Sequence, residues 1–75
     1  MSEPNLMTVE VRLFAGARQR AGLELARVEI AAPATIADLR AALAREYPRL
    51  ADLLPRALFA VDMHYVTDAT PVEPT

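Results

Sequence analysis

Few residues in this chain could carry out chemistry on a substrate. The sequence has no Cys and no Lys, and its only Ser is Ser2, close to the amino terminus. Thiol, Schiff-base and elbow-serine nucleophiles are therefore excluded. Two glycines, Gly16 and Gly22, are too few for a glycine-rich phosphate loop. We expect no catalytic residue and no bound cofactor.

A metal site would have to use His64, the only histidine, with Asp62 and Asp68 as neighbours. One imidazole and two carboxylates on a turn fall short of a closed ligand set, so a solvated turn is the simpler interpretation. Asp38 and Glu46 lie too far apart on an expected helix for paired-carboxylate catalysis. We expect no metal ion.

Charge and hydropathy exclude further classes of protein. The net charge is −2, and only two Phe and two Tyr are present, which disfavours a nucleic-acid-binding role. No apolar run is long enough to span a membrane, and residues 1–7 lack the pattern of a signal peptide. We expect a cytoplasmic protein that binds neither nucleic acid nor membranes.

The first half of the chain predicts two strands joined by a short helix, and so short a connection lets the two strands pair as a hairpin. Apolar residues alternate with polar ones from Met7 to Leu13, as in a half-buried strand. Residues 15–21 are good helix formers, and Gly22 is placed to end that helix. A second strand lies within residues 23–31. Leu23 and Leu25 have the opposite parity to Val28 and Ile30, so we expect a bulge or a bend near Ala26.

The middle of the chain predicts the main helix. Thr35 stands three residues before Asp38, the spacing of a capping box. Apolar residues then follow at helical spacing and form one stripe: Ile36, Leu39, Leu43 and Tyr47. We expect the charged residues Asp38, Arg40, Arg45 and Glu46 on the solvent side. Pro48 ends the helix.

The remaining residues predict short elements. Leu50, Leu53 and Leu54 suggest one more tight turn, and residues 57–61 form a nearly continuous apolar strand. Residues 62–64 indicate a turn, and Tyr65 and Val66 a short returning strand. The predicted fold is an α+β roll, a mixed sheet covered by one main helix. We expect residues 1–6 to be a disordered lead and residues 7–75 to form one domain.

This order of elements is that of ubiquitin-like β-grasp domains, and particular residues carry a closer resemblance. They are Leu13–Ala15 with Arg18 and Gly22, the helix at 35–43 with its exit Tyr47-Pro48, the strand at 59–62, Tyr65-Val66 and residues 70–72. Together they resemble the small subunit of molybdopterin synthase, from Met7 to Thr75. Thiamine-pathway sulfur carriers share this fold but usually lack the Tyr-Pro helix exit, so they are the second match.

The resemblance implies a sulfur carrier that has no active site of its own. In that family an ATP-dependent E1-like enzyme adenylates a C-terminal Gly-Gly, which then becomes a thiocarboxylate. The tail enters the large catalytic subunit, within a heterotetramer, and donates sulfur to the cyclic pterin precursor in molybdenum cofactor biosynthesis. Glycine suits such a tail because it has no side chain to block a narrow channel.

The sequence departs from this pattern at its carboxyl end. It finishes Val72-Glu73-Pro74-Thr75, without Gly-Gly and without a last apolar strand. In a β-grasp that strand lies beside the first one, so residues 7–13 would show an open edge. We expect a truncated form of a longer carrier. The alternative is a complete domain that takes a strand from another chain.

The resemblance also suggests which residues bind a partner. We expect Phe14, Met63 and Tyr65 to form an exposed apolar patch, and Arg18 to pair with acidic residues of the partner. The competing interpretations are a Phe14 packed under the following helix and a partly buried Tyr65. A ubiquitin-like interaction module without chemistry remains the alternative function, beside a thiamine-pathway carrier.

Overall fold

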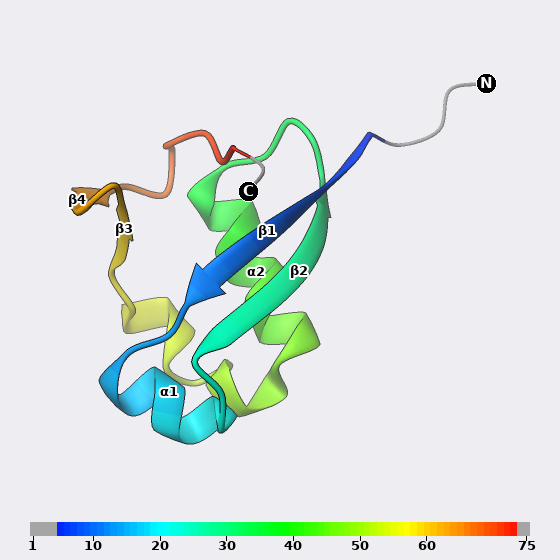
Figure 1. The fold of residues 1–75 in the computed structure, drawn as a ribbon. Coiled ribbons are helices and arrows are strands. Elements are labelled where there is room, and N and C mark those ends of the chain that lie inside the picture. Colours follow the sequence, from blue (N-terminus) through cyan, green and yellow to red (C-terminus); the bar gives the residue numbers. More distant parts are fainter. Residues whose placement is uncertain (1–4, 74–75) are drawn as a thin grey trace.

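The computed structural model describes residues 5–73, which fold as a small α+β domain (Figure 1). Its strands are β1 (Leu6–Arg12), β2 (Leu25–Ala31), β3 (Phe59–Val61) and β4 (His64–Val66). Its helices are α1 (Ala15–Ala21) and α2 (Ile36–Glu46), followed by the 3-10 turns η1 (Pro48–Leu50) and η2 (Leu54–Arg56). The predicted order of elements is confirmed, including the tight turns after the main helix.

Strands β1 and β2 pair as the predicted antiparallel hairpin. The register runs without interruption from Leu6 opposite Ala31 to Arg12 opposite Leu25. The expected bulge near Ala26 was therefore wrong. The strand keeps its alternation by leaving Leu25 on the outer, exposed face, while Val28 and Ile30 are buried. Exposing one leucine side chain costs less free energy than interrupting the backbone hydrogen bonds between the two strands.

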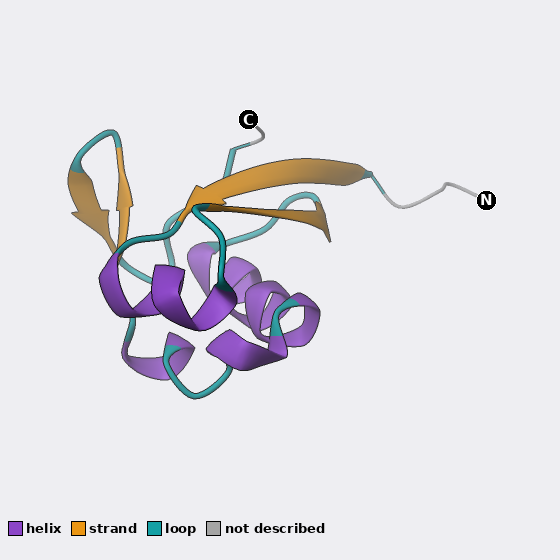
Figure 2. Ribbon diagram, turned by 60° about the horizontal axis from the view of Figure 1, so that its bottom comes forward, coloured by secondary structure: helices purple, strands orange, loops and turns teal. Residues whose placement is uncertain are grey.

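Helix α2 covers the inner face of this hairpin, and the helices together form a second layer (Figure 2). Ile36, Leu39 and Leu43 are buried along the predicted stripe, and Tyr47 is half-buried. The core also includes Leu50 and Leu54 from the turns that follow. The alternation of β1 and the stripe of α2 therefore meet in one core.

The start of α2 and the end of α1 are capped as their sequences predict. The Asp38 carboxylate accepts hydrogen bonds from the Thr35 N–H (2.9 Å) and hydroxyl (3.2 Å), which completes the capping box. The Thr70 and Asp68 carbonyls accept the next two free donors of α2. Gly22 closes α1 at φ +73° and donates its N–H to the Arg18 carbonyl at 2.9 Å. The segment after β4 is thus docked on the start of α2.

Strands β3 and β4 form a separate antiparallel hairpin to one side of β1 (Figure 1). Strand β3 is shorter than the predicted 57–61, because Leu58 lies outside the ladder and is 78% exposed. Among residues 5–73 no strand joins the two hairpins, and both pairs are antiparallel, so the expected mixed sheet is not closed. The α+β roll consistent with a β-grasp is confirmed.

The expected disordered lead overlaps the start of the first strand. The Asn5 carbonyl accepts the Ala32 N–H at 2.7 Å, and β1 begins at Leu6. Residues 1–4 lie outside the described part of the chain. Strand β1 therefore begins one residue before Met7, the first residue of the predicted alternation.

Candidate functional site

The outer edge of β1 has no strand beside it in the described part of the chain. Alternate residues of an antiparallel strand point their backbone groups to the same side. The Leu13 N–H donates to the Glu24 carbonyl at 2.7 Å, so the odd-numbered residues of β1 face β2. The backbone groups of even-numbered residues such as Thr8 and Arg12 therefore face away from β2.

An apolar groove of about 860 Å³ lies beside this open edge. Val9 and Leu13 line it from β1, and Leu58, Phe59 and Val61 line it from the β3 side. The floor is formed by buried residues of α2 and the turns that follow: Ile36, Leu39, Leu43, Leu50 and Leu54. Free backbone groups on one side and an apolar floor suit an extended peptide strand.

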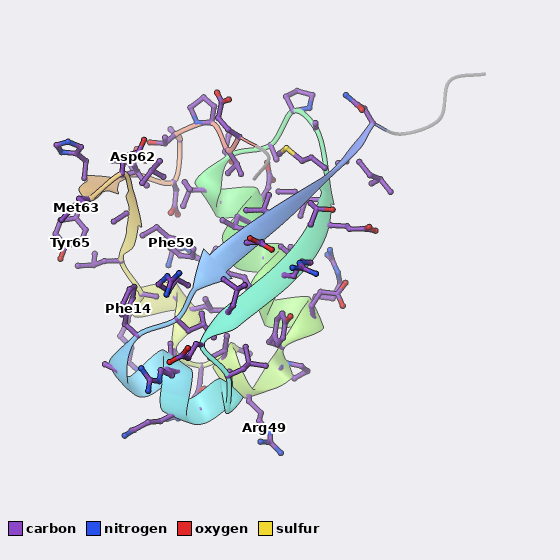
Figure 3. All side chains as sticks on the ribbon, in the orientation of Figure 1. Phe14, Arg49, Phe59, Asp62, Met63 and Tyr65 are labelled. Carbon is purple, nitrogen blue, oxygen red and sulfur yellow. The ribbon has the colours of Figure 1, made fainter. Side chains whose placement is uncertain are left out.

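Large apolar side chains stand exposed around the groove, and we call them the apolar rim: Phe14, Leu58, Val61, Met63 and Tyr65. Phe14 is 68% exposed and Tyr65 78%, and both line the groove. Figure 3 shows Phe14, Met63 and Tyr65 on the same side of the molecule. An exposed cluster of this kind is typical of a protein-binding surface. Phe14 is not packed under α1, and Tyr65 is not partly buried.

Met63 is held in an unfavourable conformation at the tip of the second hairpin. Asp62 and Met63 have φ values of +50° and +68°, the left-handed region that favours glycine or asparagine. Such a conformation costs a non-glycine residue on the order of 1 kcal/mol. The Met63 side chain is 98% exposed, so the fold gains no burial in return. A two-residue hairpin turn of this kind requires positive φ at both positions, so the strain belongs to the turn that presents Met63.

Arg40 was expected on the solvent side of α2, and that prediction was wrong. Its side chain is only 21% exposed and reaches toward β3. One guanidinium nitrogen donates to the Leu54 and Ala57 carbonyls, and the other pairs with Asp68 at 2.8 Å. The guanidinium also lies over the Phe59 ring, 4.8 Å from its centre. A long aliphatic stem lets arginine lean across an apolar surface in this way.

The outer edge of β2 is closed by a side chain. The Tyr47 hydroxyl accepts a hydrogen bond from the Arg27 N–H and donates one to the Arg27 carbonyl, both at 3.1 Å. These are backbone groups that point away from β1. Tyr47 thus occupies part of the edge where a further strand would pair, on the side opposite the groove.

Comparison with known protein families shows which family this chain is similar to. A match to the ThiS family covers residues 11–75. The chain belongs to the ThiS family of ubiquitin-like sulfur carriers. A search of curated proteins returned no match. Membership of the ThiS family implies a sulfur-carrier role, with a partner catalytic subunit and an activating enzyme as the usual companions.

Arg18 lies apart from the apolar rim in this ThiS-family chain. It sits on α1 and faces Glu24 at 3.5 Å, with both side chains well exposed. It does not line the groove. An exposed ion pair of this kind contributes little to stability, so Arg18 can exchange Glu24 for an acidic partner at little cost.

The described residues of this ThiS-family chain hold no group of three or more side chains fit for a metal ion. Among the described residues, the exposed Asp52 has a carboxyl pKa that departs from its ordinary value. Arg20 donates two hydrogen bonds of 2.7 Å to its carboxylate and lowers its pKa. Over the same residues no helix is long and apolar enough to cross a bilayer.

Sequence reasoning missed several residues of the site. The sequence predicts Leu58 and Val61 within a nearly continuous apolar strand and Arg40 on the solvent side, and it predicts no role for the Tyr47 hydroxyl. Leu58 and Val61 carried a signal, because an apolar run so close to a turn has few neighbours to cover it. The contacts of Arg40 and Tyr47 join segments distant in sequence and left no local pattern.

Proposed function

We propose that this chain is the sulfur-carrier small subunit of molybdopterin synthase. It donates sulfur from a C-terminal thiocarboxylate to the cyclic pterin precursor in molybdenum cofactor biosynthesis. The ThiS-family match supports the carrier role, and the Tyr47-Pro48 helix exit favours the molybdopterin pathway over the thiamine pathway. The observation that carries the proposal is the apolar rim beside an open groove.

A carrier needs a docking surface rather than an active site. The large catalytic subunit supplies the pterin pocket, and an ATP-dependent E1-like enzyme activates the tail. Both partners belong to the cytoplasm, where we place this chain. The rim supplies what docking needs, since Phe14, Met63 and Tyr65 present flexible and aromatic side chains of the kinds enriched at interfaces. Arg18, on α1 and apart from the rim, would pair with acidic residues of the partner in place of Glu24.

We further propose that the functional form continues beyond Thr75, as an extended strand that leads to a Gly-Gly terminus. The support is the groove itself, which has an apolar floor and borders the edge of β1, where no strand is paired in the described part of the chain. Pro71 and Val72 already line this groove. A strand laid there would join the two hairpins and leave its end free for the thiocarboxylate.

The rim is tested with the native full-length carrier and its large subunit. Phe14→Ser combined with Tyr65→Ser is expected to abolish co-purification and to weaken binding at least 100-fold, because both anchors lose their apolar area. Leu25→Ser is the matched control, since Leu25 is also exposed but lies on β2. Circular dichroism confirms that each variant is folded. Unchanged binding by the double variant would remove the rim from the interface.

The tail is tested by the mass of the native protein. An intact mass that includes a C-terminal Gly-Gly, and a gain of about 16 Da when sulfur replaces oxygen in the carboxylate, are the expected results of carrier chemistry. A native chain that ends at Thr75 would favour the second candidate, a ubiquitin-like interaction module without chemistry. The exposed rim and open edge would then serve binding alone. Preferential binding of a thiamine-pathway enzyme would assign the chain to that pathway.

A further inference from the structure

The β3–β4 hairpin carries three residues of the apolar rim, Val61, Met63 and Tyr65, yet few contacts fix its direction. Its two strands pair only with each other among residues 5–73, and none of its residues is fully buried. Phe59 and Val66 at its base pack partly against the core. Met63 and Tyr65 lie beyond these anchors and point outward (Figure 3). The orientation of the hairpin must therefore be set at its base.

Arg40 makes its contacts at that base. It holds the Leu54 and Ala57 carbonyls, which precede β3, and the Asp68 carboxylate, which follows β4. Its guanidinium covers the ring of Phe59, the first residue of β3. One side chain on a rigid helix thus contacts the chain entering the hairpin, the hairpin itself and the chain leaving it.

We propose that Arg40 is a positioning residue, which fixes the β3–β4 hairpin relative to α2 and so presents Met63 and Tyr65 to the partner. This inference rests on the proposed role of the apolar rim. Arg40 is not itself part of the docking surface, because its side chain is mostly buried behind the hairpin. It acts through the backbone and the ring that it holds.

The chemistry of arginine explains why this position needs it. Two guanidinium nitrogens point in different directions, so carbonyls and a carboxylate are held at once, and the flat face stacks on an aromatic ring. A lysine ammonium has a single nitrogen and cannot span the carbonyls and Asp68 together. Arg40→Lys therefore keeps the charge but is expected to lose the fixed direction of the hairpin.

The first test follows the hairpin alone, in the full-length carrier without its partner. Arg40→Met is expected to raise amide hydrogen exchange at residues 59–66 at least tenfold, while amides of β1 and β2 stay within twofold. Arg40→Lys gives an intermediate increase. Arg49→Met is the control, because Arg49 points away from the hairpin (Figure 3). Unchanged exchange at 59–66, or a uniform rise over all amides, would overturn the proposal.

Asp68→Asn provides a second variant in case Arg40→Met fails to fold. Asp68 is exposed, and its backbone carbonyl, which caps α2, is retained. The substitution removes only the charged partner of Arg40, so we expect a smaller rise in exchange, two- to fivefold, in the same residues. No change there would show that the Arg40–Asp68 pair does not hold the hairpin.

The second test uses binding kinetics with the large subunit. When a hairpin samples several directions, only the competent fraction binds, and the apparent dissociation constant rises in proportion. Arg40→Met is therefore expected to slow association about tenfold and leave dissociation within twofold. A faster dissociation instead would mean that Arg40 contacts the partner directly, which contradicts a positioning role.

The two proposals fail in different ways. If Phe14→Ser with Tyr65→Ser binds normally, the rim is not the docking surface, whatever Arg40 does. If that double variant loses binding but Arg40→Met leaves both exchange and association unchanged, the rim stands and the positioning role of Arg40 falls. The exchange measurement needs no partner, so it decides the role of Arg40 in either case.

Discussion

On the outer edge of β2 the Arg27 amide and carbonyl meet the Tyr47 hydroxyl, whereas the outer edge of β1 has no strand beside it in the described part of the chain and borders an apolar groove. Unpaired edges invite pairing with other chains, and proteins usually block them. Here one edge is blocked by a side chain and the other is bordered by apolar surface.

The difference between these edges shows where the sheet can grow. A strand added beside β2 would have to displace the Tyr47 hydroxyl from both groups of Arg27. A strand added beside β1 would gain hydrogen bonds and cover the apolar floor at the same time. The same hairpin therefore directs any incoming strand to one side, next to the rim that we assign to the partner.

The largest expected effect comes from placing proline at neighbouring positions of β1. Val9→Pro removes an N–H that faces β2 and distorts a buried position, so it should destabilise the domain by about 3 kcal/mol or more. Thr8→Pro removes an N–H that faces the groove and should cost about 1 kcal/mol or less. Urea denaturation of the 75-residue chain measures both. Similar losses at the two positions would contradict the assignment of the open edge.

Removing the Tyr47 hydroxyl from the outer edge of β2 is expected to have the next largest effect on stability. Tyr47→Phe leaves the Arg27 N–H and carbonyl without their partner, and should destabilise the fold by about 1–2 kcal/mol. It should also raise self-association in size-exclusion chromatography, because both edges are then unpaired. Tyr65→Phe removes an exposed hydroxyl and serves as the control. A Tyr47→Phe protein as stable as the parent would show that the hydroxyl adds nothing at this edge.

A smaller effect separates stability from binding at the rim. Met63→Gly relieves a left-handed conformation and should stabilise the domain by up to about 1 kcal/mol. It should also weaken partner binding several-fold, because the exposed side chain is lost. Asp62→Gly is the matched variant, since it relieves the neighbouring φ and keeps Met63. Equal binding by both glycine variants would remove Met63 from the interface.

The smallest effect concerns the Arg20–Asp52 pair, which lies on neither edge. The pKa of Asp52 is lowered in the folded state from its ordinary value of 3.8, because Arg20 donates hydrogen bonds to the carboxylate. Folding therefore gains from the pair above pH 3.8, and loses that gain as pH falls through the lower, folded-state pKa. Asp52→Asn should remove a slight pH dependence of unfolding in this window only. A stability curve that is unchanged by Asp52→Asn would show the pair to be neutral.

Sequence reasoning succeeded where the signal was local. The alternation in β1, the Thr35–Asp38 capping box and the Gly22 helix end each follow from residues a few positions apart. The short connection between the first two strands was enough to predict their pairing. These features need no knowledge of the rest of the fold.

The same reasoning failed where the deciding contact was distant. The parity of Leu25 suggested a bulge, but the continuous ladder and the outer face decided its place. Arg40 finds its partners 14, 17 and 28 residues away, so nothing in α2 distinguishes it from a solvated arginine. The apolar groove combines two hairpins and a helix, and only their packing reveals it.

The β3–β4 hairpin is narrow and is anchored only at its base, so a rotation at the base displaces its tip. Each strand has three residues, so the tip lies about 10 Å from the base at roughly 3.3 Å per residue. A tilt of about 10° at the base would then move Met63 by about 2 Å, a little under half of the distance between two apolar groups in contact. A small change at the base of the hairpin, away from the exposed rim, therefore displaces the Met63 side chain by a distance that matters for contact with a partner.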